Sequence, residues 1–131
     1  KAPNHVARLV ELARSGAYDG VVFHRVIDGF MAQTGDPTGT GMGGSDKPDL
    51  KAEFSNISHV RGTCSMARSQ NPNSANSQFF INFKDNDFLN GQYTVYGRVV
   101  SGMEFVDKIT RGEPPANPDR MISVKVAADV A

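Results

Sequence analysis

The sequence predicts a mostly β domain, in which an antiparallel sheet or barrel carries helices at its ends. Three observations lead to this fold class. Short runs of β-branched and aromatic residues recur along the chain. Turn dipeptides and long loops rich in glycine or asparagine separate these runs. Helical spacing of apolar residues occurs only near the start and near the end of the chain.

The first part of the chain predicts a helix, a hairpin and a loop. Apolar residues at helical spacing predict an amphipathic helix over residues 4–15. The segments GVVFHRV and GFMAQTG flank the turn dipeptide Asp28-Gly29, which predicts two strands joined by a tight turn. Residues 35–53 contain many glycines and two prolines, so we expect a long loop there.

The second part predicts further strands and one more helix. A polar loop rich in asparagine and serine separates two apolar runs, and Asn90-Gly91 marks a turn before a third run of high β propensity. The expected elements are strands over 63–67, 78–83 and 92–100, a helix over 102–110 and a closing strand over 121–130.

Length and composition limit the class of protein. The 131 residues suit a single domain, and 14 basic residues balance 14 acidic ones. A formal net charge of zero argues against binding to nucleic acid or a membrane surface as the main activity. The apolar runs are far shorter than a membrane span, so we expect a soluble domain. The single cysteine excludes an intrachain disulfide and weakly favours a cytoplasmic location.

Two sequence features, a G-x-G-x-x-G match and the single cysteine, do not predict a function of their own. Gly39, Gly41 and Gly44 satisfy G-x-G-x-x-G, but the following segment with Pro48 is a poor helix start, so we do not expect a nucleotide site. No phosphate-loop lysine follows these glycines. Cys64 lies in an apolar run and is interpreted as a core residue.

Metal and nucleophile signatures are also missing. His5, His24 and His59 lie in separate segments without metal-ligand spacing, so no metal or other cofactor is expected. No G-x-S-x-G motif marks a hydrolase.

The segment FHRVIDGFMAQ carries the most unusual pattern. Strand alternation brings Arg25 close to Phe30, Met31 and Gln33 across one tight hairpin. An arginine beside an apolar patch is either a surface residue whose stem covers the patch or one wall of a ligand groove. SQFFINF and DFLNGQY add aromatic and aliphatic side chains that suit a shallow pocket or, equally, a core.

Four segments together resemble the bacterial-type cyclophilins, a family of peptidyl-prolyl cis-trans isomerases. They are FHRVIDGFMAQTGDPTGTGMGG, GTCSMAR, SQFFIN and YGRVVSGMEFVDKI, and the resemblance extends over residues 1–131 as one domain. It implies an antiparallel β-barrel capped by two α-helices, with an active groove outside the barrel. It also implies rotation about X-Pro bonds in protein folding, without a cofactor or metal.

The resemblance further implies the site residues. Arg25 matches the catalytic arginine of the family, Phe80 the phenylalanine of its proline pocket, and Gln33 a third catalytic position. Residues 67–69 match the strip whose backbone hydrogen-bonds an extended substrate, and Gln78 is expected beside Arg25. The substrate-binding positions implied in this way are Phe30, Met31, Ala67, Arg68, Ser69, Gln78, Phe88, Leu89 and Tyr93.

The chain departs from the family pattern at three places. Phe88 stands where the best-known eukaryotic members have a tryptophan whose indole N–H helps to bind cyclosporin, so weak binding of that drug is implied. Tyr93 replaces a histidine and keeps an aromatic wall. Family members begin with two strands before the first helix, so we expect this chain to be an N-terminally truncated form with an incomplete barrel.

Three functions are compatible with these patterns. The favoured hypothesis is a monomeric prolyl isomerase that acts on proline-containing peptides and on unfolded or nascent proteins. The alternatives are a proline-peptide binding module or chaperone with little turnover, and an interaction protein that uses the NPNSANS loop. The presence of Arg25 favours catalysis.

Overall fold

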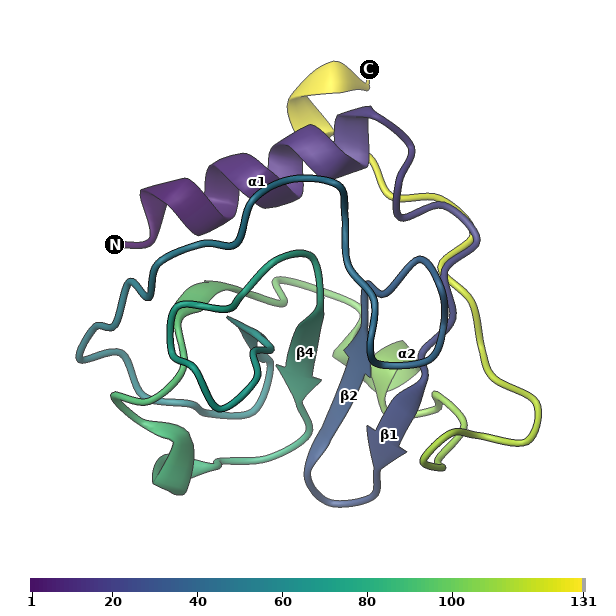
Figure 1. Ribbon diagram of the computed structural model, residues 1–131. Coiled ribbons are helices and arrows are strands. Elements are labelled where there is room, and N and C mark those ends of the chain that lie inside the picture. The colour runs from purple at the N-terminus through teal and green to yellow at the C-terminus, as the bar shows by residue number, and fades with distance from the viewer. Residues whose placement is uncertain (131) are drawn as a thin grey trace.

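A five-stranded antiparallel sheet forms the centre of the protein (Figure 1). The computed structural model describes residues 1–130. The strands follow the order β1-β2-β4-β3-β5 across the sheet. Their bounds are β1 Arg25–Ile27, β2 Met31–Thr34, β3 Thr63–Met66, β4 Phe79–Asn82 and β5 Val95–Arg98. The predicted mostly β class is confirmed, although the sheet does not close into the barrel that the resemblance implies.

Within residues 1–130, two α-helices and two short 3-10 helices accompany the sheet. They are α1 Pro3–Arg14, α2 Met103–Val106, η1 Asp87–Leu89 and η2 Ala127–Asp129. Helix α1 agrees with the predicted helix to within one residue at each end. It lies across one end of the sheet, with η2 beside its last turn (Figure 1). No helix in this part of the chain is long and apolar enough to cross a membrane.

Helix α2 is shorter than the predicted helix over 102–110. The guanidinium of Arg111 donates to the carbonyl oxygens of Asp107 and Ile109 at 2.8 and 2.7 Å. The chain after α2 continues in turns, in which Lys108 N–H bonds to Phe105 and Ile109 N–H to Val106. A side chain therefore takes carbonyls that a longer helix would use for its own backbone.

The predicted closing strand over 121–130 is wrong. Met121 exchanges backbone hydrogen bonds with Gly20 and Val21, but the N–H of Val124 donates instead to the Asp19 carboxylate. No strand of the described residues runs beside 122–126, and the chain then forms η2. Apolar alternation becomes a strand only where a neighbouring backbone offers hydrogen bonds.

The hairpin of β1 and β2 sets the two faces of the sheet. Its register pairs Arg25 with Gln33 and Val26 with Ala32, which confirms the tight hairpin predicted around Asp28-Gly29. Because directly opposed residues share a face, the row containing Arg25 lies on one side and the row containing Val26 on the other.

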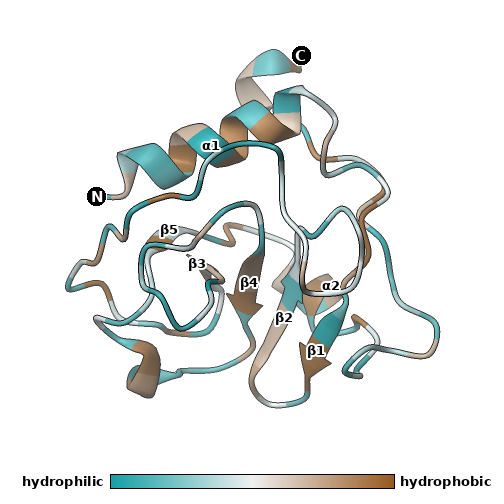
Figure 2. Cartoon of the chain, viewed as in Figure 1, coloured by the Kyte–Doolittle hydropathy of each residue, from teal (hydrophilic) through white to brown (hydrophobic). Residues whose placement is uncertain are grey.

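A hydrophobic core covers the face that carries Val26 and Ala32. These two residues pack with Phe23 and Phe83, and Met103 and Val106 of α2 pack against them, as do Ile109 and Met121. The strand β4 is hydrophobic over most of its length (Figure 2), and its Phe80 belongs to a second cluster with Met31 and Leu89. The opposite face of the sheet carries Arg25, Gln33 and Phe80.

Helix α1 turns polar side chains toward the rest of the protein. Its buried residues are His5, Arg8 and Leu12, whereas the apolar Val6 is 42% exposed. Two of the three buried side chains of this helix are therefore polar. Burying polar groups costs free energy unless they are hydrogen-bonded, so the partners of these side chains matter for stability.

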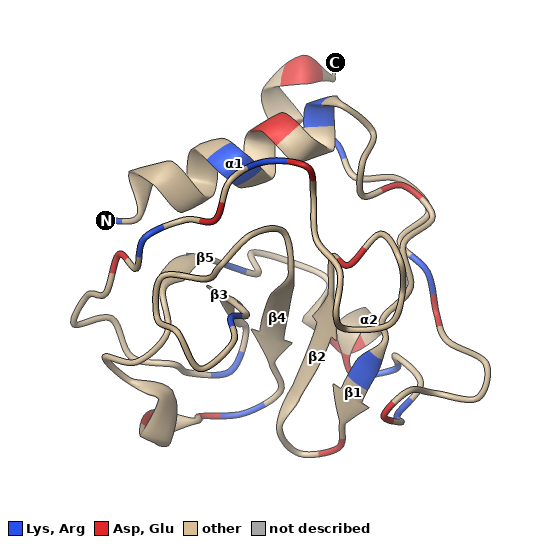
Figure 3. Cartoon of the chain, viewed as in Figure 1, with Lys and Arg blue, Asp and Glu red and all other residues tan. Residues whose placement is uncertain are grey.

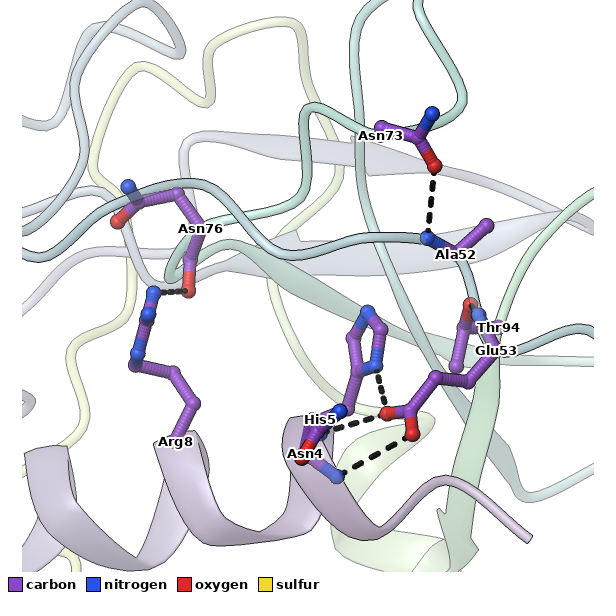
Figure 4. A network of polar contacts seen from close by, with 8 residues as sticks. All are labelled: Asn4, His5, Arg8, Ala52, Glu53, Asn73, Asn76 and Thr94. Carbon is purple, nitrogen blue, oxygen red and sulfur yellow. Dashed lines mark hydrogen bonds and ion pairs between the residues drawn. The ribbon is translucent and has the colours of Figure 1, made fainter.

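Glu53 supplies the partner of the first turn of α1 (Figure 4). Its carboxylate accepts the backbone N–H groups of Asn4 and His5 and also the Nδ1 of His5. No side chain of α1 caps this end. An acid from a distant loop therefore replaces a local N-cap and complements the positive end of the helix dipole.

Arg8 connects α1 to two further loops (Figure 4). Its guanidinium donates to the carbonyl oxygens of Asn76 and Pro48 at 3.2 and 2.7 Å. The side chain of Asn76 in turn donates to the carbonyl of Lys47 and to Asp49. The helix is thereby tied to the loops that contain Pro48 and Asn76.

A mostly apolar cleft of about 800 Å³ separates α1 from β5. Val6 and Ala7 line it from the helix, and Val95 and Val99 from the region of β5. The strand β5 lies at one margin of the sheet. The presence of strands preceding residue 1 stays a prediction of the resemblance.

We expect Glu53→Gln to destabilise the fold by about 1–3 kcal/mol, because it removes a charged acceptor from buried donors. Burial alone would raise the pKa of Glu53, but the hydrogen bonds from His5 and Asn4 outweigh it and lower the pKa. The stability that this carboxylate contributes is therefore complete above the ordinary pKa of 4.5 and is lost as the pH falls through the lowered value. Urea unfolding at several pH values measures this difference between parent and variant.

Glu11→Gln is the matched control, because Glu11 lies on the same helix with an exposed side chain and pairs with Lys47 at 3.6 Å. It should change the free energy of unfolding by less than about 0.5 kcal/mol. Equal effects of the two substitutions, or a difference for Glu53→Gln that does not shrink in acid, would contradict the proposed role of Glu53.

Candidate functional site

Four strands place one row of side chains across the face opposite the core. Arg25 lies opposite Gln33, Gln33 opposite Phe80, and Phe80 opposite Ser65. The antiparallel register thus gathers the three residues that the resemblance implies as catalytic. Arg25 is half-exposed, whereas Phe80 is 4% exposed and forms the floor of the site.

A small pocket lies over Phe80. Its volume is about 110 Å³, which suits a single ring or side chain and is well below the size of a drug-sized ligand site. Met31 of β2 and Leu89 of η1 are buried against Phe80, although these two segments are far apart in the sequence. The residues that line the pocket are Arg25, Phe30, Met31, Gln33, Ala67, Arg68, Phe80, Leu89 and Tyr93.

Aromatic contacts fix the walls of this pocket. Phe80 and Tyr93 meet edge to face with ring centroids 5.7 Å apart, and the guanidinium of Arg68 lies 4.6 Å from the centre of the Tyr93 ring. Arg68 also donates to the carbonyl of Gln92 through Nε and Nη2, at 3.0 and 2.7 Å. Phe88 lies outside the pocket, where it is 63% exposed and packs against Phe30.

His59 supports the floor from below, and sequence reasoning missed it. It is fully buried, and its ring stacks parallel to Phe80 at a centroid distance of 6.5 Å. Asn90 accepts from both the backbone N–H and Nδ1 of His59. Burial lowers the pKa of His59, so the ring is neutral at physiological pH and behaves as an aromatic packing group.

A second, larger pocket of about 560 Å³ adjoins the first. Gln33 and Arg68 line both pockets, and the amide of Gln33 donates to the side-chain oxygen of Gln78 at 2.9 Å. The amide of Gln78 then donates to the carbonyls of Gly41 and Gly43. Ser69 and Arg68 line the opposite side. The groove thus offers a narrow pocket for one ring and a wider, more polar space beside it.

Residues 67–69 form the strip between these pockets. The N–H of Ala67 bonds to the carbonyl of Gln78, and the N–H of Ser69 bonds to the hydroxyl of Ser74. The backbone N–H and carbonyl of Arg68 have no partner within residues 1–130. One residue of the strip therefore presents both a donor and an acceptor to an extended peptide.

The glycine-rich loop folds around the buried carboxylate of Asp36. The carboxylate of Asp36 accepts the backbone N–H groups of Thr38, Thr40, Gly41 and Gly43. Burial alone would raise the pKa of Asp36, but the hydrogen bonds from Gly43 and Thr38 lower it to about 2. A Cβ at Gly43 would lie 2.4 Å from the carboxylate, so only glycine fits there.

The remaining candidates have structural surroundings. Burial raises the pKa of the Cys64 thiol to about 11, so the thiol stays protonated at neutral pH. His24 is buried, and burial lowers the pKa of its ring. Within residues 1–130 no group of three or more His, Cys, Asp or Glu side chains could hold a metal ion.

The structure brings the implied site residues together, with two qualifications of detail. Phe88 contacts the rim and not the pocket. The hydrogen-bonding partner of Arg25 is Glu113, at 3.0 Å from Nε, while Gln78 contacts Gln33. The catalytic and binding roles of these residues stay predictions.

Comparison with known proteins gives one consistent result. The family model for cyclophilin type peptidyl-prolyl cis-trans isomerases matches residues 1–126. A probable peptidyl-prolyl cis-trans isomerase of Brucella abortus is 58% identical over 144 aligned positions, which cover 98% of this chain and 74% of that protein. Peptidyl-prolyl cis-trans isomerase B of Escherichia coli is 45% identical over 118 positions, covering 83% of this chain and 72% of that protein.

Solved structures agree with the sequence relatives. The cyclophilin AquaCyp293 of Hirschia baltica superposes with a TM-score of 0.91 at 30% identity, covering 99% of this chain and 68% of that one. A Cryptosporidium parvum cyclophilin gives a TM-score of 0.89 at 31% identity, covering 95% of this chain and 85% of that one. The matched family model, the relatives and the shared fold show that this chain belongs to the cyclophilin-type peptidyl-prolyl cis-trans isomerases.

Proposed function

We propose that the isomerase activity resides in the small pocket over Phe80, with Arg25 as the group that stabilises the twisted X-Pro amide. One observation carries this proposal: the sheet register sets Arg25, Gln33 and Phe80 in a single row, with the free backbone of Arg68 beside them. A peptide bound along the groove would then meet an apolar floor, a cation and a backbone anchor at once.

The chemistry requires no covalent step. Resonance in the amide C–N bond gives a rotation barrier of about 18–20 kcal/mol. Rotation removes this resonance and returns lone-pair density to the proline nitrogen. A guanidinium donor fixed near that nitrogen stabilises the twisted amide more than either planar form. The remaining residues need only hold the peptide in position.

The pocket suits the pyrrolidine ring of proline. Its floor and walls are the apolar Phe80, Met31 and Leu89, closed on one side by Tyr93. With the ring held there and the flanking peptide anchored at Arg68, rotation is confined to the acyl side of the bond. This division between a fixed ring and a moving carbonyl is what the narrow pocket supports.

Arginine alone does not account for fast catalysis. Raising the rate from about 0.01 to about 1000 per second requires about 7 kcal/mol of transition-state stabilisation. A charge-assisted hydrogen bond contributes about 1.5–3 kcal/mol net. Preorganisation of the peptide and exclusion of water over Phe80 must therefore supply the larger share.

Substrates are proposed to be exposed X-Pro segments of unfolded or nascent chains. Cyclophilins bind proline-containing peptides, and the C. parvum cyclophilin was crystallised in the presence of the dipeptide Ala-Pro. The open groove of this chain supports the same class of ligand in extended form. None of the comparisons favours the alternative of a binding module with little turnover.

We expect Arg25→Ala to lower kcat/KM for a short X-Pro peptide by about 10- to 1000-fold, because it removes the proposed transition-state donor. The measurement is protease-coupled isomerisation at equal folded concentration, checked by circular dichroism. Arg98→Ala is the control, since Arg98 is an exposed arginine that lines the cleft beside α1 and no part of the groove. Peptide binding without turnover by the parent would favour the binding module, and full activity of Arg25→Ala would remove Arg25 from the mechanism.

Phe88 is proposed to limit the affinity for cyclosporin. It is exposed at the rim and lacks an N–H, so the hydrogen bond that the family tryptophan donates to the drug is missing. Phe88→Trp should tighten cyclosporin binding by about 2- to 13-fold, which is the ratio for one net hydrogen bond of about 0.5–1.5 kcal/mol. Titration calorimetry of the parent, Phe88→Trp and Phe88→Leu measures this change. An affinity of Phe88→Trp no better than that of the parent would count against the missing N–H as the cause.

A further inference from the structure

The acidic partner of Arg25 comes from the C-terminal part of the chain. Nε of Arg25 donates to Oε1 of Glu113 at 3.0 Å, across 88 positions of sequence. Within residues 1–130 the guanidinium makes no other hydrogen bond, so both Nη groups are unpaired. Gln33, directly opposite on β2, directs its amide to Gln78. Glu113 is thus the one polar contact that orients the guanidinium in the described structure.

We propose that Glu113 is a positioning residue, which holds the guanidinium of Arg25 against the pocket while leaving its Nη groups free for the twisted amide. This inference rests on the role of Arg25 proposed above. A hydrogen bond at Nε fixes the plane of the guanidinium, because Nε lies at its base. The long side chain would otherwise sample several rotamers, and ordering it before the substrate binds removes that cost from the reaction.

The backbone holds Glu113 in register with β1. Gly112 and Val26 exchange two backbone hydrogen bonds, each of 2.8 Å, in an antiparallel bridge. Glu113, which follows Gly112, therefore lies beside Arg25, which precedes Val26. Gly112 has a φ of +148°, and a Cβ there would lie 2.5 Å from the Cα of Pro115. A side chain at this position would displace the loop that carries Glu113.

Arg111 anchors the same loop to the core. Its guanidinium lies 4.2 Å from the centre of the Phe83 ring, and its Nε donates to Asp28 at 3.1 Å. Together with its bonds to the carbonyls after α2, this arginine ties the loop to the β1–β2 turn and to the hydrophobic core. Glu113 therefore follows directly on two anchored residues, Arg111 and Gly112.

The exposure of the Arg25–Glu113 pair indicates a small contribution to stability. Basic and acidic residues are interspersed along the chain, and Arg25 is the one basic residue of β1 (Figure 3). Both members of the pair are about half-exposed, at 46% and 55%. An exposed pair of this kind contributes little to folding. Its effect should therefore appear in the kinetics and not in the stability.

The test compares Glu113→Ala with Glu113→Gln. Alanine removes the acceptor, whereas glutamine keeps a side-chain oxygen for Nε and loses only the charge. We expect Glu113→Ala to lower kcat by about 3- to 10-fold with a smaller change in KM, and Glu113→Gln to retain at least half of the parent kcat. Asp129→Ala is the matched control, because Asp129 accepts from Nε of Arg14 at 2.8 Å in another exposed pair, beside α1. It should leave kcat unchanged.

The NMR signal of the Arg25 Nε–H gives a readout that a general loss of structure would not imitate. In the parent and in Glu113→Gln this proton should exchange slowly with water, and in Glu113→Ala it should exchange rapidly while the backbone spectrum away from the loop is retained. Slow exchange in Glu113→Ala would show that another contact orients Arg25 and would overturn the inference.

Arg25→Ala separates this inference from the proposed function. If Arg25→Ala loses activity and Glu113→Ala stays within about twofold of the parent, Glu113 is not a positioning residue and the role of Arg25 stands. If Arg25→Ala itself keeps full activity, the proposed function fails first. In the double variant Arg25→Ala with Glu113→Ala, the second substitution should cause no further loss, and a multiplicative loss would contradict action through Arg25.

Discussion

The register of the antiparallel sheet is the constraint on which the groove depends. A slip of one residue in β2 would exchange its two faces and move Gln33 and Met31 into the core. The register is held at the hairpin end, where Phe30 N–H bonds to Ile27 and Phe83 N–H bonds to Phe30. Asn86 reinforces this point by donating to the carbonyl of Phe30. The outer row of side chains and the core on the reverse face are therefore fixed together.

Buried polar contacts carry this order from the sheet to α1. The backbone N–H of Glu53 donates to the hydroxyl of Thr94, and the carbonyl of Thr94 accepts the N–H of Met66 in β3. The Glu53 carboxylate meanwhile holds the first turn of α1 through His5. Thr94 directly follows Tyr93, so the contact that fixes the helix also restrains a wall of the groove. Loss of one member would leave buried donors unpaired, which is why such networks order several loops at once.

Sequence patterns predicted those features that local periodicity encodes. The helix α1, the β1–β2 hairpin and the positions of β3, β4 and β5 follow from spacing, turn dipeptides and β propensity. The strand pattern alone left Arg25 equally well explained as a surface residue, and the resemblance implied the role proposed for it. The contacts of His59 and Glu113 were missed because their partners lie in distant segments. The segment 121–130 has the alternation of a strand, but within residues 1–130 no strand runs beside its second half.

Division of the catalytic work explains why the recognisable signature is long. One hydrogen bond falls well short of the about 7 kcal/mol of transition-state stabilisation that fast catalysis requires. The rest must come from many contacts that immobilise the peptide and exclude water. In the proposed mechanism these contacts come from the pocket lining, which belongs to β2, β4, η1 and the segments around Arg68 and Tyr93. In that mechanism each contact contributes a modest amount, so no short motif of a nucleophile, base or metal is required. The family is instead recognised by several strand segments whose common property is that the sheet brings them to one pocket.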